Sequence, residues 1–543
     1  MPRLLENLPQ CDISQNDLDK IKIFLMKLKI SVLISFVFAN MLLCQAQQDK
    51  ANLIQFPQNN ATNVNPDTHL VLTFSETPIL GQSGKVRIYD ASNNKLVDSL
   101  DLSIPVGPTV RDTTKVGYTP KPYEYISGHF TNANTKPGTP SGVALPTSNK
   151  YQLTIIGGFT DAFHFYPVII HRNVATIYPH NNLLDYNKNY FVTIDSKVFS
   201  LPSDSFKGIR GSSSWTFSTK KTAPANGQTK LVVNANGSGD FNTVQGALDF
   251  IPENNQQPIT IFIKKGIYEE IVYFRKKSNI TFVGEDREKT IVCYQNNEVF
   301  NPHPANIGTN ELRGTFPSRR AAVAADNCNN ITFCNLTLMT TAKGQAEGLL
   351  LTGEHNMLYK VNIKGWGDAL QVNGSAYIKD SKIEGNGDMI LGRGAAFFDS
   401  CEFHSRGAFM WIRNSQDNHG NVFLSCTFQG TGKELTEIAR EPINRGKTYP
   451  YSEAVLINCR LGGISSEGWG EIDGETTNIH YWEYNSTNLS DGKLIDASLR
   501  HPASKQLNME KDATTIANYS NPPFVLGGWN PPIKDLTKIF SVK

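Results

Sequence analysis

Short runs of alternating apolar and polar residues recur at near-constant intervals in the second half of this 543-residue chain. Their apolar anchors, separated by 25, 20, 20, 25 and 33 residues, are Leu338, Ile363, Ile383, Phe403, Phe428 and Leu461. Asn, Asp and Gly residues stand at the bends between the runs. A repeat of this length and pattern predicts a parallel β-solenoid, in which successive coils stack their strands in register.

Two aspartates occupy the same station of neighbouring repeats. Asp368 follows the anchor Ile363 by five residues, and Asp388 follows the anchor Ile383 by five. Strands of adjacent coils lie about 4.8 Å apart, so the two carboxyl groups should lie close together. Two carboxyl groups so close do not both ionise readily, which favours one acid and one nucleophile or base. The alternative is that both aspartates only cap bends, a common structural role.

The N-terminal segment has the order of a secretory signal. Four lysines between positions 20 and 29 precede the apolar run 30–43, which is too short to span a bilayer comfortably. Small residues follow and predict cleavage after Ala46, so residues 1–46 are expected to be a signal peptide with an upstream extension before Met26. No transmembrane segment is expected, and Cys44 leaves a lipid anchor as an alternative.

Charge and cysteine usage narrow the classes of function. The net charge is +2, and the folded part has no dense block of Lys or Arg, so we expect no nucleic-acid partner. Six cysteines follow the leader without CxxC spacing, and Cys401, Cys426 and Cys459 each stand two residues before a repeat anchor. These positions predict stacked core residues rather than disulfides or a zinc site, and we assign no metal to them.

The chain before the repeats has a different character. Residues 51–219 contain short alternating runs separated by Pro, Gly and Asn clusters, which predicts an all-β sandwich. Its opening, FPQNNATNVNPDTHLVLTFSETP, resembles bacterial immunoglobulin-like domains found beside secreted enzymes. The polar stretch 220–229 is typical of a linker, so the repeat module should occupy residues 230–543.

The repeat module resembles the pectin methylesterases, carbohydrate esterase family 8. The ordered motifs that carry the resemblance are VVNANGSGDFNTVQGALDFIP, IFIKKGIYEE, NITFVGEDREKTI, WEYNST and YSNPPFVLGGW, running from Val232 to Trp529. The resemblance implies an all-β chain, with a right-handed parallel β-helix preceded by the immunoglobulin-like β-sandwich. It also implies a secreted carboxylic ester hydrolase that removes methyl esters from galacturonate units of pectin and releases methanol.

The same resemblance implies roles for four residues. The motif GWGDAL makes Asp368 the general acid and base, and GNGDMILG makes Asp388 the nucleophile. The motif GQAEGL makes Gln345 a donor to the developing oxyanion, and IAREP makes Arg440 the partner that keeps Asp388 charged. This chemistry needs no metal and no organic cofactor.

Two departures from the family pattern lie beside these motifs. Gly367 stands where the family has a second glutamine, and Gln371, a possible substitute, is expected to point to the opposite face of its strand. The insertion INRGKTYP follows the arginine motif and leaves Arg445 as a rival to Arg440. Both departures predict altered substrate preference or reduced activity.

A pectin-binding groove would use aromatic side chains as platforms for sugar rings. The candidates are Trp469 in SEGWGE, Trp366 beside the acid, and Trp411 in FMWIRN. The alternative for each is an ordinary place in the core, since tryptophan is mostly buried.

Two other functions remain open. A β-helical pectin lyase would need a calcium-binding carboxylate cluster with a basic residue, and a hydrolase would need a further carboxylate; neither occurs at matched repeat positions. A catalytically weak or silent pectin-binding or adhesion protein is kept open by Gly367 and the N-terminal sandwich. We expect a monomer that binds pectin (homogalacturonan) and is secreted, periplasmic or on the cell surface of a bacterium.

Overall fold

The computed structural model describes residues 53–110, 142–143, 151–157, 159–203, 206–302, 318–444 and 446–533. The predicted signal peptide, residues 1–46, and the rival Arg445 lie outside these ranges. Within them, no helix is both long enough and apolar enough to cross a membrane.

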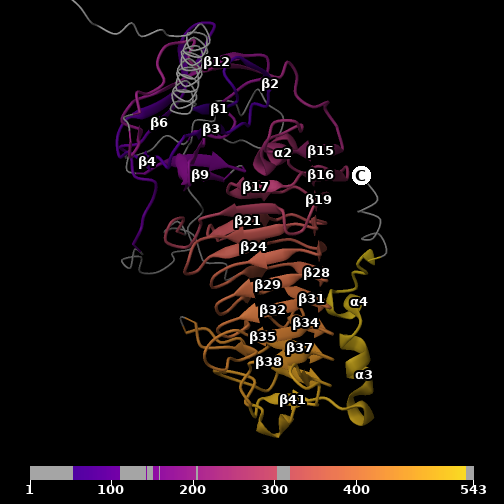
Figure 1. Cartoon of the computed structure of the whole chain (residues 1–543). Coiled ribbons are helices and arrows are strands. Elements are labelled where there is room, and N and C mark those ends of the chain that lie inside the picture. The colour runs from indigo at the N-terminus through magenta and orange to yellow at the C-terminus, as the bar shows by residue number, and fades with distance from the viewer. Residues whose placement is uncertain are drawn as a thin grey trace, which may run out of the picture.

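Three parallel sheets wind together into a β-helix, with coils stacked from β15 at one end to β41 at the other (Figure 1). The first sheet runs β15 (Lys230–Val233), β16 (Ile259–Ile263), β19 (Ile280–Gly284), β22 (Thr332–Cys334), β25 (Asn356–Tyr359), β28 (Ser375–Lys379), β31 (Ala395–Asp399), β34 (Asn421–Leu424), β37 (Glu453–Ile457), β39 (His480–Tyr484) and β41 (Ser504–Gln506). The second runs β17 (Gly266–Glu269), β20 (Thr290–Tyr294), β23 (Thr337–Thr340), β26 (Asn362–Lys364), β29 (Lys382–Gly385), β32 (Glu402–Ser405), β35 (Thr427–Gly430), β38 (Arg460–Gly462) and β40 (Thr487–Asn488). The third runs β18 (Val272–Arg275), β21 (Ala321–Asp326), β24 (Glu347–Leu351), β27 (Leu370–Val372), β30 (Ile390–Gly392), β33 (Met410–Ile412) and β36 (Ala439–Arg440).

The repeat anchors form one continuous row in the second sheet. Each pairs with the next in the order Leu338, Ile363, Ile383, Phe403, Phe428 and Leu461. All six are at most 3% exposed, and the rings of Phe403 and Phe428 stack with centroids 4.7 Å apart. Like residues stacked in register bury their apolar surface against each other, which stabilises the column of coils. The prediction of a parallel β-helix is confirmed.

The cysteines of the β-helix pack in the same way. All six cysteines in the described part of the chain are free and buried. The backbone N–H of Cys401 donates to Sγ of Cys426 at 3.4 Å, so these two side chains lie on adjacent coils. The prediction that the cysteines are core residues is confirmed.

Residues before the β-helix form a separate pair of sheets. One has the order β1 (Ile54–Phe56), β3 (Leu70–Thr73), β11 (Val174–Ile177) and β10 (Val168–His171). The other has the order β2 (Ala61–Val64), β14 (Thr216–Thr219), β12 (Asn189–Ile194), β5 (Lys85–Asp90) and β6 (Lys95–Asp101), and a short pair joins β13 (Phe199–Ser200) to β4 (Ile79–Leu80). The fully buried Trp215 belongs to their shared core, which is distinct from that of the β-helix. An immunoglobulin-like identity stays a prediction.

A further N-terminal sheet packs on the β-helix instead of the sandwich. It consists of β7 (Gly142–Val143), β8 (Leu153–Ile156) and β9 (Phe159–His164). Ile156 and Phe163 are part of the β-helix core, and the Phe163 ring lies 4.7 Å from that of Tyr273. The N-terminal region and the β-helix therefore share an apolar interface that the sequence pattern did not reveal.

Helix α2 (Val244–Phe250) covers the first coil of the β-helix. Its N-cap Thr243 accepts a hydrogen bond from the N–H of Gly246, and the buried carboxyl of Glu270 accepts from the N–H groups of Val244 and Gln245 at 2.8 and 3.0 Å. These contacts satisfy backbone donors that a helix start leaves unpaired. Glu270 thus has a structural role.

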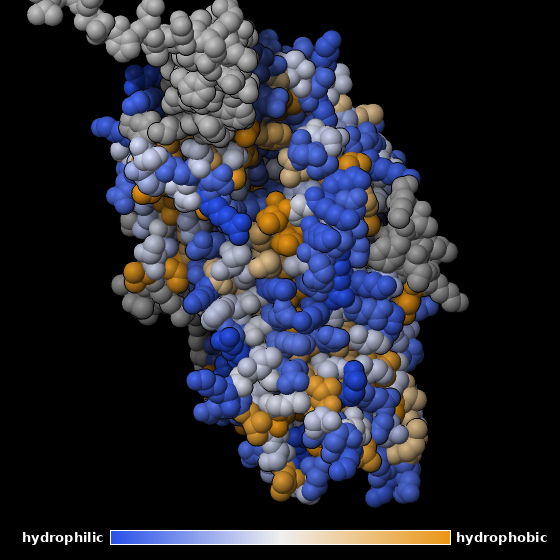
Figure 2. Space-filling model, viewed as in Figure 1, coloured by the Kyte–Doolittle hydropathy of each residue, from blue (hydrophilic) through white to orange (hydrophobic). Residues whose placement is uncertain are grey.

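The outer surface is mostly hydrophilic on the face seen in Figure 2, with apolar residues only in small groups. Large apolar side chains that are exposed, such as Ile79 at 60% and Leu494 at 70%, lie far apart in the sequence. The apolar content of the chain is therefore concentrated in the cores between sheets.

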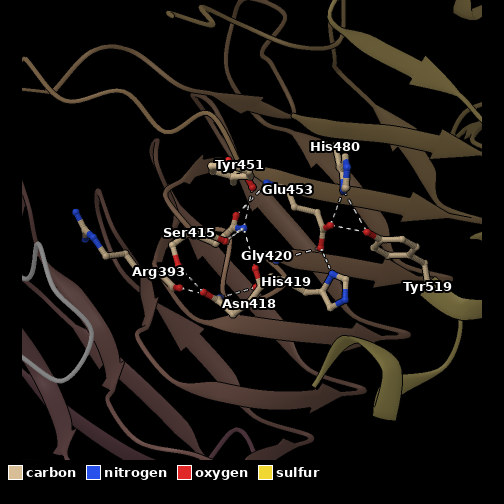
Figure 3. Close-up of polar contacts among 10 residues, drawn as sticks. Arg393, Ser415, Asn418, His419, Gly420, Tyr451, Glu453, His480 and Tyr519 are labelled. Carbon is tan, nitrogen blue, oxygen red and sulfur yellow. Dashed lines mark hydrogen bonds and ion pairs between the residues drawn. The ribbon is translucent and has the colours of Figure 1, made fainter. Parts of the chain in front are cut away.

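The C-terminal segment returns along the first sheet (Figure 1). It contains the short 3-10 helix η1 (Ala497–Leu499), α3 (Met509–Tyr519) and α4 (Pro522–Val525). The hydroxyl of Tyr519 in α3 donates to Oε2 of Glu453 at 2.5 Å, and His419 and His480 contact the same carboxylate through Nδ1 at 2.9 and 2.8 Å (Figure 3). Burial raises the pKa of Glu453, but the bonds from the two histidines outweigh it and lower the pKa to about 2.

We expect this carboxylate to make stability depend on acid pH. A carboxyl whose pKa is lowered on folding stabilises the fold above its unfolded pKa, and that contribution is lost as the pH falls through the folded value. The free energy of unfolding, measured by denaturant titration, should therefore fall between about pH 4.5 and pH 2 by roughly 3 kcal/mol more in the native chain than in Glu453→Gln. The exposed Glu402→Gln is the matched control, and equal pH dependence in the native chain and Glu453→Gln would contradict the expectation.

Candidate active site

Asp368 and Asp388 lie at corresponding bends of neighbouring coils. The bend of Asp368 joins β26 to β27, and that of Asp388 joins β29 to β30. The residues before them, Gly367 and Gly387, form a parallel bridge, and the N–H of Asp368 donates to the carbonyl of Gly387 at 3.3 Å. Both aspartates have left-handed backbone, with φ of 65° and 43°, a conformation that Asp adopts more readily than most residues. The structure therefore places the pair at one station of adjacent coils, as the twenty-residue step predicts.

Arg440 binds the carboxylate of Asp388 through two nitrogens of its guanidinium. Nε donates to Oδ1 at 2.7 Å and Nη2 donates to Oδ2 at 2.6 Å. A two-pronged pair of this kind fixes the carboxylate in one orientation. The side chain of Asp388 is 17% exposed, so the oriented carboxylate is still accessible to a ligand.

Asp368 has different surroundings. It is only 4% exposed, and its Oδ2 lies 3.1 Å from Nη2 of Arg320. Burial raises the pKa of Asp368 above its ordinary value, Arg320 opposes the rise, and the charge of Asp388 adds to it. The two aspartates thus have different surroundings although they share one station: Asp388 is held by a guanidinium and partly exposed, whereas Asp368 is buried with a raised pKa.

Gln345 lies one coil before Asp368 and two coils before Asp388, next to Gly367 in the stack of coils. These two residues form a parallel bridge, and a second bridge links Gly367 to Gly387, so the three stand in one column. Gln345 is exposed, so its amide is available to a molecule bound beside the aspartates. Gly367 contributes no side chain to that column.

The expectation that Gln371 faces away from the site is wrong. The alternation rule applies along a strand, but Asp368 has left-handed backbone outside β27, so residue counting from it fails. Gln371 belongs to a row of paired residues that continues through Leu391 and Trp411 to Arg440, which holds Asp388. Residues in such a row point to the same side of the sheet, so Gln371 faces the candidate site.

The burial of Trp469 argues against its predicted role as a sugar platform. The side chain is 1% exposed and belongs to the β-helix core. Its ring stacks on Tyr481 with centroids 4.8 Å apart and planes 10° apart. Tyr481 covers one face of the indole, and Trp469 therefore packs inside the β-helix.

The other two tryptophans lie nearer the aspartates. Trp366 is half-buried two residues before Asp368, and Nζ of Lys343 lies 5.3 Å from its ring centroid. Trp411 is half-buried between two arginines, with the guanidinium carbon of Arg413 at 4.7 Å and that of Arg440 at 5.8 Å from its ring. Both remain candidates for contact with a sugar.

The β-helical part of the chain is similar to known proteins. The Pectinesterase family model matches residues 230–527. The chain is 31% identical over 308 residues to Pectinesterase 31 of Arabidopsis thaliana, covering 54% of this chain and 92% of that protein. It is 29% identical over 301 residues to Pectinesterase QRT1 of the same plant, covering 52% and 74%.

The chain belongs to the pectinesterase family. Among solved structures, the pectin methylesterase from carrot is 23% identical, covers 58% of this chain and 98% of its own, and has a TM-score of 0.47. The pectin methylesterase from Yersinia enterocolitica is 18% identical, covers 53% and 99%, and has a TM-score of 0.41. This pectinesterase is a carboxylic ester hydrolase that removes methyl esters from pectin.

A buried charge cluster beside Asp368 was missed from the sequence. Arg320 is 8% exposed; its Nε donates to the fully buried Glu347 at 2.9 Å, and its Nη1 lies 3.8 Å from Glu298. Burial alone would lower the pKa of Arg320, but Asp368, Glu347 and Glu298 raise it, so the guanidinium stays charged. Burial raises the pKa of Glu347 to about 7 against the opposing effect of Arg320.

A weak signal for this cluster exists in the sequence. Arg320 directly precedes the apolar strand AAVAAD, and Glu347 opens the apolar strand EGLLL. A charge at the start of an apolar strand ordinarily marks a solvated end. Only the pairing of β21 with β24, which places Ala321 opposite Glu347, shows that both charges are buried together.

We expect Arg320→Met to alter both stability and pH dependence. Loss of the cation leaves Glu347 and Asp368 buried without it, which should lower the free energy of unfolding by about 3 to 5 kcal/mol. The pKa of Asp368 should rise further, so its protonated form persists to higher pH. The alkaline limb of the pH profile for methanol release should then move to higher pH.

A second buried ion pair supplies the control. Arg500→Met breaks the pair with Glu483, whose Nε to Oε1 distance is 2.8 Å, far along the β-helix from the aspartates. It should lower stability without moving the pH profile. An alkaline limb that stays in place or moves to lower pH in Arg320→Met contradicts the expected effect of Arg320 on the pKa of Asp368.

Proposed function

We propose that this pectinesterase cleaves its methyl ester by nucleophilic attack of Asp388, with Asp368 as general acid and then general base. The carboxylate of Asp388 attacks the ester carbonyl, and the C–O bond to the methoxy group breaks as Asp368 gives its proton to that oxygen. Methanol leaves, and the galacturonate acyl group is held on Asp388 as an anhydride.

The second half returns the enzyme to its starting state. Asp368, now ionised, takes a proton from water, and the hydroxide adds to the acyl carbonyl. The anhydride bond breaks, giving a galacturonic acid group, the free carboxylate of Asp388 and a protonated Asp368, and the new acid group then releases its proton to solvent. No group outside the chain, the ester and water is consumed.

One observation carries the proposal. Two carboxyl groups share a station on adjacent coils, yet one is oriented by a two-pronged guanidinium and the other is buried with a raised pKa. That contrast supports opposite roles for chemically identical side chains.

Gln345 supports the oxyanion in this proposal. Gln345 is exposed and stands in the column that runs through Gly367 to Gly387, the residues that directly precede the two aspartates. A donor of this kind contributes about 3 kcal/mol to stabilisation of the transition state. Because Gly367 offers no side chain, Gln345 supplies the amide of this column alone.

We further propose that the protein is a secreted, periplasmic or surface-bound monomer of a bacterium. The basic, apolar and small-residue order of residues 1–46 supports the export part of this proposal. In this proposal residues 51–219 are an immunoglobulin-like spacer or platform for the catalytic module, residues 220–229 the linker, and residues 230–543 the β-helix.

The nucleophile is tested with Asp388→Asn. The amide cannot attack the ester, so methanol release from highly methylated pectin should fall by at least about a thousandfold. His404→Ala is the control, because His404 lies on β32 in the second sheet and should leave the rate unchanged. Substantial methanol release by Asp388→Asn would contradict the role of Asp388 as the nucleophile.

The oxyanion role is tested with Gln345→Ala. Loss of the amide should lower kcat by about 100-fold to 1,000-fold with a smaller change in KM, because the contact strengthens only as negative charge develops. A change confined to KM would instead indicate a role in binding pectin.

A further inference from the structure

A short turn after β20 lies between the N-terminal region and the candidate active site. It spans residues 296–301 and is closed by its own hydrogen bonds. Oδ1 of Asn297 accepts from the N–H groups of Val299 and Phe300 at 3.0 and 2.8 Å, and the N–H of Asn301 donates to the carbonyl of Asn297 at 3.0 Å. Phe300 is 6% exposed and Asn301 is 2% exposed. Because the turn is compact and buried, its two sides do not move independently.

One side of the turn is bound to strand β9 of the N-terminal region. The N–H of His164 donates to Oδ1 of Asn301 at 2.8 Å, and Nδ2 of Asn301 donates back to the carbonyl of His164 at 3.2 Å. Nδ1 of His164 lies 2.6 Å from the carbonyl oxygen of Phe300. The ring of Phe300 stacks on that of Tyr166, with centroids 4.7 Å and planes 8° apart. The N-terminal region therefore holds this side of the turn by polar and aromatic contacts.

The other side of the turn is bound to the backbone around Arg320. Nδ2 of Asn301 also donates to Oδ1 of the fully buried Asn296 at 2.9 Å. Nδ2 of Asn296 donates in turn to the carbonyls of Arg319 and Ala321 at 2.8 and 2.7 Å. These two residues directly flank Arg320 in the chain. The two buried asparagines thus connect β9 to the backbone that carries Arg320.

The same turn also contacts Gln345 and the side chain of Arg320. The N–H of Glu298 donates to the carbonyl of Gln345 at 2.9 Å, and Oε2 of Glu298 lies 3.8 Å from Nη1 of Arg320. Nη2 of Arg320 lies 3.1 Å from Oδ2 of Asp368. A displaced turn would therefore move both Gln345 and Arg320. A shift of about 1 Å in a catalytic group lowers a rate by about 100-fold.

We propose that Asn301 is a positioning residue for ester cleavage, which holds Arg320 and Gln345 in place through this turn. This inference rests on the proposed function of the aspartate pair. Without the Asn301 amide, Oδ1 of Asn296 loses its donor, and a buried acceptor without a donor drives the turn to rearrange. Through β9, the N-terminal region contributes to the geometry of the active site in addition to its proposed role as a platform.

Steady-state kinetics of Asn301→Ala test this role. The kcat for methanol release from highly methylated pectin should fall by about 10-fold to 100-fold, while KM changes by less than about threefold. The reason is that Gln345 and Arg320 are displaced, whereas the rest of the surface that binds pectin is not. Arg320 lowers the pKa of Asp368, so its displacement should also move the alkaline limb of the pH profile to higher pH.

A second variant covers the case in which Asn301→Ala does not fold. Asn301→Asp keeps the size of the side chain and the acceptor for the N–H of His164, but it cannot donate to Asn296. It should show the same fall in kcat and the same direction of shift in the pH profile.

Asn65→Ala is the matched control. The fully buried Asn65 also joins the N-terminal region to the β-helix, since its Nδ2 donates to Oδ1 of Asn242 at 2.7 Å and to the carbonyl of Gly239 at 3.2 Å. These contacts lie beside the start of α2, on the first coil. Asn65→Ala should lower stability but leave kcat and the pH profile unchanged. Equal kinetic effects in Asn65→Ala and Asn301→Ala, or none in Asn301→Ala, overturn the positioning role.

Hydrogen exchange separates this inference from the proposed chemistry. Amide exchange in peptides covering 296–301 and 343–347, measured by mass spectrometry on the whole protein, should be about fivefold faster or more in Asn301→Ala than in the wild type. It should be unchanged in Asn65→Ala. If the wild type releases no methanol, the proposed function fails while exchange still tests the link. Unchanged exchange in Asn301→Ala contradicts the link alone.

Discussion

Register between the coils of the β-helix is the constraint on which the site depends. Parallel ladder hydrogen bonds hold equivalent residues of adjacent coils about 4.8 Å apart, whatever those residues are. The bridge from Gly367 to Gly387 therefore fixes how Asp368 meets Asp388. Because the bends have no long loops to move, this geometry is set by the core rows beneath them and does not need a ligand to form.

Because register places both carboxyl groups at the same station, the side chains around each group decide its chemistry. Asp388 meets a guanidinium from a strand two coils further on, whereas Asp368 meets Arg320, whose charge is shared with the buried Glu347. Because Arg320 also pairs with Glu347, it lowers the pKa of Asp368 less than it would alone. Burial therefore still raises the pKa of that carboxyl. Two identical side chains can thus take opposite roles without a metal ion in the proposed mechanism.

What the sequence predicted well depends on local periodicity. The twenty-residue step placed Asp368 and Asp388 at one station, because strand register follows the apolar anchors. Interactions that depend on packing were not predictable in this way. Trp469 matched a motif, but its burial against Tyr481 follows from the three-dimensional core. Gln371 was misplaced because the left-handed bend at Asp368 breaks the alternation of the strand.

The central claim is that the charge of Asp388 helps to keep Asp368 protonated. Infrared difference spectroscopy of the carboxyl C=O band of Asp368 across pH, in the wild type and in Asp388→Asn, measures this directly. The account predicts that the pKa of Asp368 is lower in Asp388→Asn, because the neighbouring negative charge is gone. An unchanged or higher pKa in that variant would contradict it.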